Sequence, residues 1–449
     1  MPTNQAQNNF PFVAWLRDVA PYIHSFRGKT FVIGFAGELV QKGGLEALIQ
    51  DVAMLHAMGM RIVLIHGSRP QVQEQLDLRK VPSHYGTGAM SGYRITDPAA
   101  LECAKEASGE IRLDIEAAFS QGLPNTPMAG SRISVISGNF IIARPVGIVD
   151  GTDFMHTGLV RKVDSESIAH SLLNNKIVLM SPLGFSPTGQ AFNLAYEDVA
   201  TATAIALRAD KLIFLTEYNG LYELNNDGQK ELITELSLPQ LEQHMQALKP
   251  EDADLKVLLQ HTNRAIKAGV GRVHLLPHDR DGALLEELFT HDGISTMIAA
   301  SDIEHLREAT LDDVGGILQL IEPLEEEGIL VARGRDVIER DIMHFSVIEH
   351  DRVLFGCAAL FPYPNGIGEL SCLAVDPESQ GAGDGERLLK RIEARAKSSG
   401  LKKIFVLTTR TEHWFLKRGF VRASVDDLPE ERQALYNWER KSMVLMKTL

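Results

Sequence analysis

The run Leu370-Ser371-Cys372-Leu373-Ala374-Val375 is followed, after a short gap, by Gln380-Gly381-Ala382-Gly383-Asp384-Gly385. A helical pattern then covers residues 386–397, with Leu388, Leu389, Ile392 and Ala396 on one face. A strand that leads through glycines into a helix presents bare backbone N–H groups to an anion. Glycines also let the backbone approach a pyrophosphate closely. Glycines alone are typical of a surface turn, but the flanking strand and helix favour a phosphate site.

Length and charge bound the possible functions. A chain of 449 residues is expected to form two or three domains, each with its own core. The formal net charge of −14 argues against nucleic acid as a general partner. An acidic substrate would therefore need a locally basic site.

Cysteine usage and hydropathy indicate the compartment. Cys103, Cys357 and Cys372 show neither disulfide pairing nor metal-ligand spacing, and the last two lie in apolar strand patterns. We expect buried thiols in a reducing compartment. No signal sequence opens the chain and no apolar run is long enough to span a bilayer, so we expect a cytoplasmic protein with no membrane partner.

Residues 1–300 alternate between strands and helices after a leading helix at 12–26. Continuous apolar strands separated by helices predict a parallel sheet covered on both faces. The leading helix, assigned to a segment 1–28, is rich in aromatic residues; it packs on its own domain or on a neighbouring subunit. The predicted strands of the α/β domain, 29–300, are 30–35, 61–65, 133–135, 177–180, 212–215, 272–276 and 295–298.

Residues 301–449 have a different order and predict a smaller α+β domain. Thr310-Leu311-Asp312-Asp313 has the pattern of a capping box before a helix. Strands are expected at 346–350, 353–360 and 368–375, before the helix at 386–397, for which Gly400 is the expected C-terminal cap. A strand at 403–407, a short helix at 413–418 and a strand at 443–446 complete the order.

Gln380-x-x-Gly383-x-Gly385 resembles the acetyl-CoA loop of the GNAT acetyltransferases, and the element order of 301–449 resembles a GNAT domain. The resemblance implies acetyl-CoA as co-substrate, with no metal. It places the pyrophosphate on residues 380–385. It also implies that backbone groups of Leu373 and Val375 hold the pantetheine arm and polarise the acetyl carbonyl. The side chains of these two residues have the character of ordinary core.

Acetyl transfer to an amine requires a base and a proton donor. Glu369 lies just upstream of the acetyl position, among Ile367, Gly368 and Leu370, a semi-apolar setting that would raise its pKa. We assign it as the general base, which takes the proton of the amine through a water molecule. The alternative is that it is an exposed carboxylate at a strand entry.

The proton donor is less clear in the sequence. Phe415 stands where many GNAT enzymes carry a tyrosine. Thr408 is one substitute as acid and Tyr436 is another, and for each the alternative role is structural, as a hydroxyl that caps a strand end.

Residues 30–298 resemble the amino acid kinase family, and within it the acetylglutamate kinases. The matching stretches are 31–37, 66–70, 94–97, 137–139, 216–220 and 269–274. Active kinases of this family carry a lysine where this chain has Gly34. Phosphoryl transfer depends on positioning and charge stabilisation, so we expect this domain to bind a regulator and not to phosphorylate.

The arginine-sensitive acetylglutamate kinases imply a regulator and its site. The matching residues are Tyr22, Lys211, His274, Glu287 and Gly293. A carboxylate such as Glu287 suits a guanidinium, which makes planar, charge-assisted contacts. Taken singly, His274 reads as a core histidine, Glu287 as a solvated charge on a helix and Lys211 as a cap at a strand entrance.

Stretches across the whole chain resemble the bacterial N-acetylglutamate synthases: 281–285, 327–335, 407–410 and 436–442. That resemblance implies acetyl transfer to L-glutamate as the first step of arginine synthesis, with L-arginine as feedback inhibitor. It also implies a homohexamer locked by the leading helices. Of the arginines near the acetyl site, we select Arg333 and Arg440 to bind the two substrate carboxylates.

Two other functions stay open on the sequence alone. One is a working acetylglutamate kinase with an appended regulatory GNAT domain, against which Gly34 argues. The other is a non-enzymatic arginine sensor that only binds acetyl-CoA, against which the complete Gln-x-x-Gly-x-Gly pattern and Glu369 argue.

Overall fold

The computed structural model describes residues 11–121, 133–224, 229–249, 252–290, 293–300, 305–350, 353–377 and 384–449. Contacts divide the chain into two compact units, 1–303 and 304–449. Each unit contains its own main sheet and its own hydrophobic clusters. The expected division into a larger α/β unit and a smaller α+β unit is present.

The first unit is built on an eight-stranded sheet in which neighbouring strands are parallel, except for β17 and β18. In spatial order the strands are β16 (Glu235–Ser237), β18 (Thr296–Ala299), β17 (Arg272–Pro277), β13 (Lys211–Thr216), β1 (Thr30–Phe35), β2 (Arg61–His66), β10 (Ile177–Met180) and β5 (Val135–Ser137). A parallel sheet needs helical crossovers, which cover both of its faces.

Alternate residues of the central strands belong to two separate cores. On β1, Val32 packs into one cluster, while Phe31, Ile33 and Phe35 pack into the other. The first face is covered by α6 (Ser165–Leu173), α7 (Tyr196–Leu207), α8 (Leu238–Ala247) and α9 (Ala253–Lys267). The second is covered by α1 (Pro11–Phe26), α2 (Gly37–Gln41), α3 (Leu45–Ala57), α5 (Pro98–Ser120) and α10 (Ala283–Phe289). Burial on both faces explains the continuous apolar strands in the sequence.

The first unit also contains small β elements that the sequence pattern did not predict. A four-stranded sheet has the order β12 (Ala191–Asn193), β11 (Leu183–Phe185), β6 (Ile141–Pro145) and β9 (Gly158–Val163). Three two-stranded ribbons are β3 (His84–Tyr85) with β4 (Arg94–Ile95), β7 (Ile148–Val149) with β8 (Thr152–Asp153), and β14 (Leu221–Leu224) with β15 (Lys230–Ile233). Helix α4 (Arg69–Leu78) follows β2 directly.

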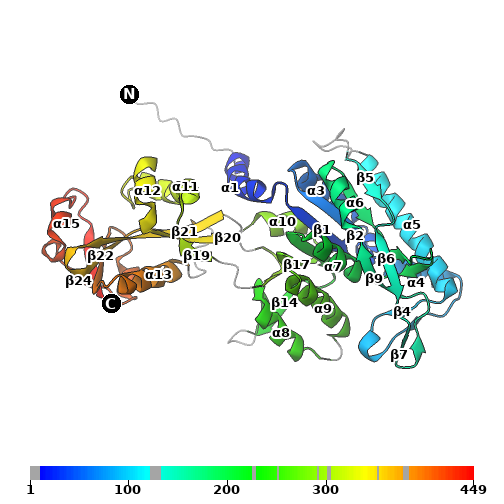
Figure 1. Ribbon diagram of the computed structural model, residues 1–449. Coiled ribbons are helices and arrows are strands. Elements are labelled where there is room, and N and C mark those ends of the chain that lie inside the picture. The colour runs from blue at the N-terminus through cyan, green and yellow to red at the C-terminus, as the bar shows by residue number, and fades with distance from the viewer. Residues whose placement is uncertain are drawn as a thin grey trace. The chain divides into compact units, whose positions relative to one another are not determined.

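The second unit is a seven-stranded sheet with helices on both faces. Its order is β19 (His305–Glu308), β20 (Phe345–His350), β21 (Val353–Tyr363), β22 (Ile367–Val375), β23 (Lys403–Thr408), β25 (Met443–Thr448) and β24 (Val421–Ala423). Helices α11 (Val314–Glu326) and α12 (Arg335–Asp341) lie on one face, and α13 (Asp384–Ser398) lies on the other (Figure 1). Two short helices, α14 (Glu412–Leu416) and α15 (Glu430–Ala434), follow β23 and β24.

Two end signals predicted for the helices are present. Thr310 and Asp313 form a capping box, in which the Asp313 carboxylate accepts the Thr310 backbone N–H at 2.7 Å. Arg307 binds the same carboxylate at 2.7 Å. Gly400 adopts a left-handed conformation, with φ of 77°, after the end of α13.

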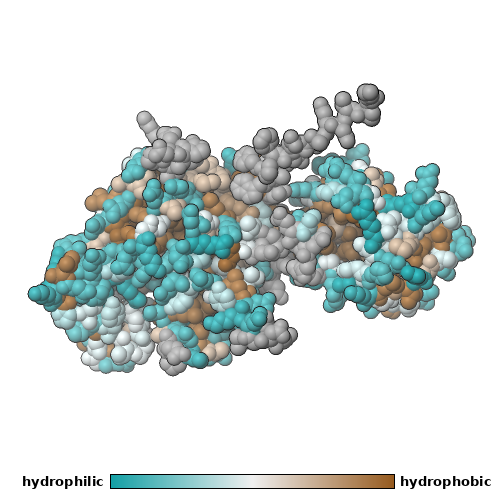
Figure 2. All heavy atoms as spheres, turned by 180° about the vertical axis from the view of Figure 1, so that it is seen from behind, coloured by the Kyte–Doolittle hydropathy of each residue, from teal (hydrophilic) through white to brown (hydrophobic). Residues whose placement is uncertain are grey.

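Hydrophobic side chains are spread over the visible surface. On the face drawn in Figure 2, hydrophilic residues cover most of each unit and brown patches are scattered among them. The exposed apolar residues come from separate elements, as in most globular proteins. Cys103, Cys357 and Cys372 are buried and unpaired, as expected.

Replacement of Leu388 by alanine should destabilise the second unit strongly. Leu388 is 0 % exposed and lies between α13 and the sheet, so Leu388→Ala should cost about 2–5 kcal/mol of unfolding free energy. The control Leu435→Ala, at a leucine that is 73 % exposed, should cost less than about 0.5 kcal/mol. Urea unfolding followed by tryptophan fluorescence measures both, because Trp414 and Trp438 lie in this unit. Equal losses in the two variants would contradict the packing of α13.

Candidate functional site

Strand β22 carries an irregularity at the expected acetyl position. Its partner β21 pairs Cys357 with Ala374 and Ala359 with Ser371, so two residues of β22 oppose one of β21. Cys372, inside this bulge, has a φ of 49°, which is left-handed and uncommon for a residue with a side chain. A bulge re-aims the backbone N–H groups around it. Those of Leu373 and Val375 lie in this segment.

The bulge coincides with a divergence of two parallel strands. Strand β22 pairs with β23 from Ile367 opposite Lys403 up to Leu370 opposite Val406. Beyond that point, no strand in the described residues pairs with this edge of β22. A strand edge that loses its neighbour presents N–H and C=O groups to an extended ligand. This edge therefore suits the arm of a linear co-substrate.

The glycine-rich loop is only partly described. Gln380, Gly381, Ala382 and Gly383 lie outside the described residues, whereas Asp384 and Gly385 begin α13. Gly385 lies tight against α14, because an added Cβ atom would stand 3.2 Å from Trp414. The start of α13 follows β22 in the chain, and a side chain at residue 385 would press against Trp414.

Glu369 lies on β22 before the bulge and is held by two side chains that the sequence pattern did not indicate. Its Oε2 accepts from Arg432 Nε at 2.9 Å and from the Tyr363 hydroxyl at 3.1 Å. Its Oε1 accepts from Arg432 Nη2 at 3.2 Å. The Glu369 side chain is 10 % exposed and that of Arg432 is 18 % exposed, so the pair is largely screened from water. Burial first, and then the charge of Glu369, raise the pKa of Tyr363 to about 12.

This setting differs from the semi-apolar one expected from sequence. Neighbours in a strand point to opposite faces, so Gly368 and Leu370 do not surround the Glu369 carboxylate. Arg432, from α15, does. The only sequence signal for it was the charged stretch Glu430-Glu431-Arg432, which is equally typical of a solvated helix.

The two arginines selected for substrate make different contacts within the second unit. Arg333 Nη2 donates to the Ser371 hydroxyl at 2.8 Å, and Nη1 contacts the sulfur of Cys372. Arg333 therefore reaches the bulge itself. Arg440 donates through Nη2 to the carbonyl oxygens of Gly328, at 3.1 Å, and Ile329. It holds the loop that leads into Arg333.

The candidate proton donors already make hydrogen bonds within the protein. Thr408 ends β23, lies 2.7 Å from the Thr411 hydroxyl and accepts the Thr411 backbone N–H at 3.1 Å. Tyr436 donates to the Ser442 carbonyl at 2.6 Å. Phe415 is buried and packs edge-on against Phe420, with ring centroids 5.2 Å apart. Phe415 thus belongs to the core.

Three of the residues expected to bind arginine, Lys211, His274 and Glu287, form a connected, buried network in the first unit, called here the arginine network. Lys211 Nζ, at the start of β13, lies 3.2 Å from His274 Nε2 on β17. His274 Nδ1 lies 2.7 Å from Glu287 Oε1 on α10. Burial alone would raise the pKa of Glu287, but the hydrogen bond and charge of His274 outweigh it and lower the pKa. Burial first, and then Lys211, lower the pKa of His274.

The network is closed by the loop before β18 and by the leading helix. Glu287 Oε2 accepts the backbone N–H groups of Ile294 and Ser295 at 2.8 and 3.1 Å. A side chain at Gly293 would clash with this carboxylate, since an added Cβ would lie 2.7 Å from Oε2. Phe26 of α1 lies between the Lys211 ammonium, 4.9 Å from its ring centroid, and Tyr22, whose ring is 6.2 Å away.

Gly34, at the position of the kinase lysine, lies in a tightly packed place. An added Cβ would stand 3.2 Å from the Ala200 Cβ and 3.4 Å from ring carbons of both Phe214 and Tyr196. Helix α7 supplies two of these neighbours. A longer side chain at residue 34 would therefore require α7 to move.

The described part of the chain has no helix long and apolar enough to cross a bilayer, and no cluster of three or more His, Cys, Asp or Glu side chains placed to hold a metal ion.

Comparisons with known proteins agree with this division of the chain. Residues 29–277 match the amino acid kinase family, and residues 316–420 match the acetyltransferase (GNAT) family. The crystal structure of N-acetylglutamate synthase from Neisseria gonorrhoeae complexed with coenzyme A and L-arginine is similar, with a TM-score of 0.83 and 38% identity. The match covers 98% of this chain and 99% of that one. The same Neisseria protein with coenzyme A and N-acetyl-glutamate gives a TM-score of 0.61 at 39% identity, with the same coverage.

Sequence relatives match over the full length. The amino-acid acetyltransferase of Azotobacter vinelandii is 48% identical over 440 residues, or 98% of this chain and 99% of the relative. That of Ralstonia nicotianae is 65% identical over 449 residues, or 100% of this chain and 97% of the relative. The chain belongs to the amino-acid acetyltransferase family.

Proposed function

We propose that this chain is an N-acetylglutamate synthase, which transfers the acetyl group of acetyl-CoA to the α-amine of L-glutamate in the first step of arginine synthesis. The observation that carries the proposal is the bulge of β22 beside the open strand edge, with Arg333 bound to it at Ser371. A thioester arm and an anionic amino acid would meet there. The Neisseria structures, in complex with coenzyme A and with N-acetyl-glutamate, support the same pair of ligands.

The chemistry assigned to the chain's own residues has three parts. Glu369 takes a proton from the substrate ammonium through a water molecule, and the amine nitrogen then forms a bond to the acetyl carbon. Backbone N–H groups at Leu373 and Val375 stabilise the oxyanion on the acetyl oxygen. As the amide forms, the nitrogen gives up a second proton to solvent; the C–S bond breaks, and the thiolate leaves with a proton from Thr408 or, as the alternative, Tyr436, which solvent then reprotonates.

The Glu369–Arg432 pair explains how the base keeps one position. A bidentate guanidinium fixes the plane of a carboxylate, and the Tyr363 hydroxyl adds a third contact. The carboxylate therefore stays on β22 just before the bulge. The start of α13, together with residues 380–383 that precede it, is assigned to the pyrophosphate.

Removal of the base should slow turnover without preventing binding. Glu369→Gln should lower kcat by about 10²–10⁴-fold at neutral pH, because the substrate amine is then protonated and has no acceptor. The loss should shrink as the pH rises, because the amine loses its proton to solvent. Release of CoA thiol measures the rate. The exposed control Glu439→Gln should match the unmodified enzyme. Undiminished turnover of Glu369→Gln at neutral pH would reject Glu369 as the base.

Arg333 should determine the affinity for glutamate. Arg333→Lys keeps the charge but loses the forked guanidinium, so KM for glutamate should rise about tenfold or more while KM for acetyl-CoA stays the same. The matched control is Arg335→Lys two residues along, where an exposed side chain pairs with Glu339, and neither constant should change. An equal rise in both constants for Arg333→Lys would mean that the residue only supports the bulge.

We also propose that L-arginine inhibits the enzyme by binding at Tyr22, Lys211, His274, Glu287 and Gly293. The buried Glu287 carboxylate is the natural partner of a guanidinium, and the Phe26 ring contacts both the tilted ring of Tyr22 and the Lys211 ammonium. The kinase-like domain, which has Gly34 in place of a charged residue, serves this regulation and does not phosphorylate.

Loss of the Glu287 charge should weaken the arginine response. In Glu287→Gln, the arginine concentration for half-maximal inhibition should rise about tenfold or more, as expected for one lost charged hydrogen bond. Glu286→Gln, the adjacent residue on α10, is exposed and pairs with Arg280, so it should leave this concentration unchanged. Glutamate-dependent CoA release with and without arginine gives both values. Equal inhibition curves for the two variants would place the effector elsewhere.

We place the enzyme in the cytoplasm and propose a homohexamer joined through the segment 1–28. In α1, Val19 and Phe26 pack into the unit's own core, whereas Leu16 is 44 % exposed. The C-terminal half of the helix is thus anchored on its own unit, and Leu16 lies on a part of the helix that can contact a neighbour.

A further inference from the structure

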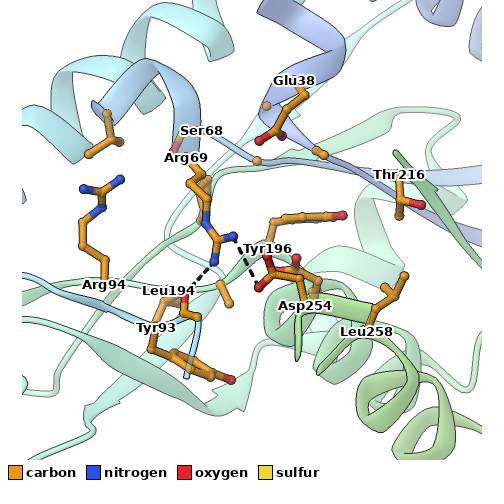
Figure 3. Close-up of a pocket in the computed structure, with 18 of the residues that line it drawn as sticks. Glu38, Ser68, Arg69, Tyr93, Arg94, Leu194, Tyr196, Thr216, Asp254 and Leu258 are labelled. Carbon is orange, nitrogen blue, oxygen red and sulfur yellow. Dashed lines mark hydrogen bonds and ion pairs between the residues drawn. The ribbon is translucent and has the colours of Figure 1, made fainter. Parts of the chain in front are cut away.

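A pocket lies at the carboxyl ends of β1, β2 and β13, where the functional residues assigned above do not reach. It has a volume of about 150 Å³, and its walls come from α2, α4, β4, α7 and α9 (Figure 3). The arginine network contains Lys211, at the first residue of β13, whereas the pocket contains Thr216, at the last. A strand rises about 3.3 Å per residue, so these positions are roughly 16 Å apart. The pocket is therefore a separate site.

Four acidic side chains, called here the pocket carboxylates, line this space. They are Glu38, Glu197, Glu217 and Asp254. Burial first raises the pKa of Glu197 to about 7; Arg69 acts against this, while Glu38 and Asp254 add to it. Carboxylates that share one space raise one another's pKa, and a bound cation would offset their charge. Acidic side chains alone would not define a site, but buried polar atoms of two further side chains in the same walls lack hydrogen-bond partners among the described residues.

Arg94 is one such group. It is 7 % exposed and lines the pocket, and its Nη1 donates to Gln73 Oε1 at 2.9 Å and to the Ser83 hydroxyl. Its Nη2 has no hydrogen-bond partner among the described residues. A buried guanidinium nitrogen without a partner costs free energy, which a ligand acceptor would recover.

His278 is the second. It is 6 % exposed and lines the pocket, and neither ring nitrogen has a partner in the part of the chain that the structure describes. Burial is the main cause of its lowered pKa, so the imidazole is neutral near pH 7. A neutral imidazole offers one donor and one acceptor, and the acceptor suits an ammonium N–H.

Arg69 lies in the pocket between Arg94 and Asp254 (Figure 3). Its Nη2 donates to the Gly92 carbonyl at 2.6 Å, and its Nη1 lies 3.9 Å from Asp254 Oδ1 (Figure 3). The rings of Tyr93 and Tyr196 line the same space. Tyrosine faces attract organic cations, and Tyr196 stays a neutral phenol because burial, followed by Glu197, raises its pKa.

These groups select the chemistry of a ligand. Four carboxylates against two arginines repel the phosphates of a nucleotide. The volume is also below the roughly 300–1,000 Å³ of pockets that hold drug-sized molecules. A small molecule with one carboxylate and two ammonium groups would match this lining. Its carboxylate would accept from an arginine, and its positive net charge would offset the excess of pocket carboxylates.

We propose that this pocket binds a small basic amino acid with an ammonium side chain. Its carboxylate meets Nη2 of Arg94, and its ammonium groups lie among the pocket carboxylates, with His278 accepting one N–H. This site is distinct from the acetyl-transfer site and from the arginine network, and the proposal does not depend on the function assigned to either.

Isothermal titration calorimetry of the full chain with L-lysine at about pH 8 tests the proposal. One site per chain is expected. Glu197→Gln and Arg94→Leu should each weaken it about tenfold or more, as expected for the loss of a charged partner. Asp254→Asn serves as a second variant that should weaken binding, because this side chain is 59 % exposed and its replacement does not endanger folding. The matched control Glu166→Gln, on the distant α6, should bind lysine normally.

Two further titrations test where the ligand binds and which of its groups is recognised. Cadaverine, which lacks the carboxylate, should bind more weakly than lysine, and Arg94→Leu should remove that difference. Lysine binding should persist in Glu287→Gln, in which the arginine network is altered. No heat at millimolar lysine, loss of binding in Glu287→Gln but not in Glu197→Gln, or displacement of lysine by ATP would each overturn the proposal.

Discussion

A strand that is buried on both faces has no place for charge along its length, and this constraint decides where chemistry can occur in the first unit. The interior residues of β1, β2 and β13 are apolar and fully buried. Charged groups therefore collect where strands end. Lys211 begins β13 beside the network around Glu287, while Thr216 ends the same strand in the pocket around Arg69. Strand β13 thus separates the charges around Glu287 from those around Arg69, and no side chain belongs to both groups.

The second unit meets the same constraint by a local irregularity. Strand β22 lies inside a sheet with helices on both faces, so a regular ladder would occupy all of its backbone groups. The bulge at Cys372 and the end of pairing at Leu370 release part of that ladder. The polar side chains then lie beside the break: Glu369 before it and Arg333 across it. The proposed acetyl site therefore rests on backbone geometry more than on any single side chain.

The regular parts of this fold could be predicted from the sequence. The bounds of β1 and β10 agree with the apolar runs, because burial on both faces makes the length of such a run equal to the length of the strand. The capping box at Thr310 followed from local hydrogen bonding alone.

The contacts between distant segments could not be predicted in the same way. Arg432 reaches Glu369 from 63 residues away, and the bulge depends on how β21 and β22 align. The residues of the arginine network were known only through the family resemblance, since neither spacing nor periodicity links Lys211, His274 and Glu287. The pocket residues Arg69 and Arg94 stood in stretches that carried the resemblance, but their convergence on the pocket carboxylates requires three dimensions.

The packing at Gly34 has an evolutionary consequence. Ala200 and Tyr196 of α7 occupy the space around its Cα, so a lysine at this position would no longer fit without changes in the helix. Tyr196 is also a wall of the pocket. A lysine at residue 34 would thus need compensating changes in α7, and a change at Tyr196 would also alter the pocket. Ordinary van der Waals contact therefore makes the absence of a lysine at residue 34 difficult to reverse by a single substitution.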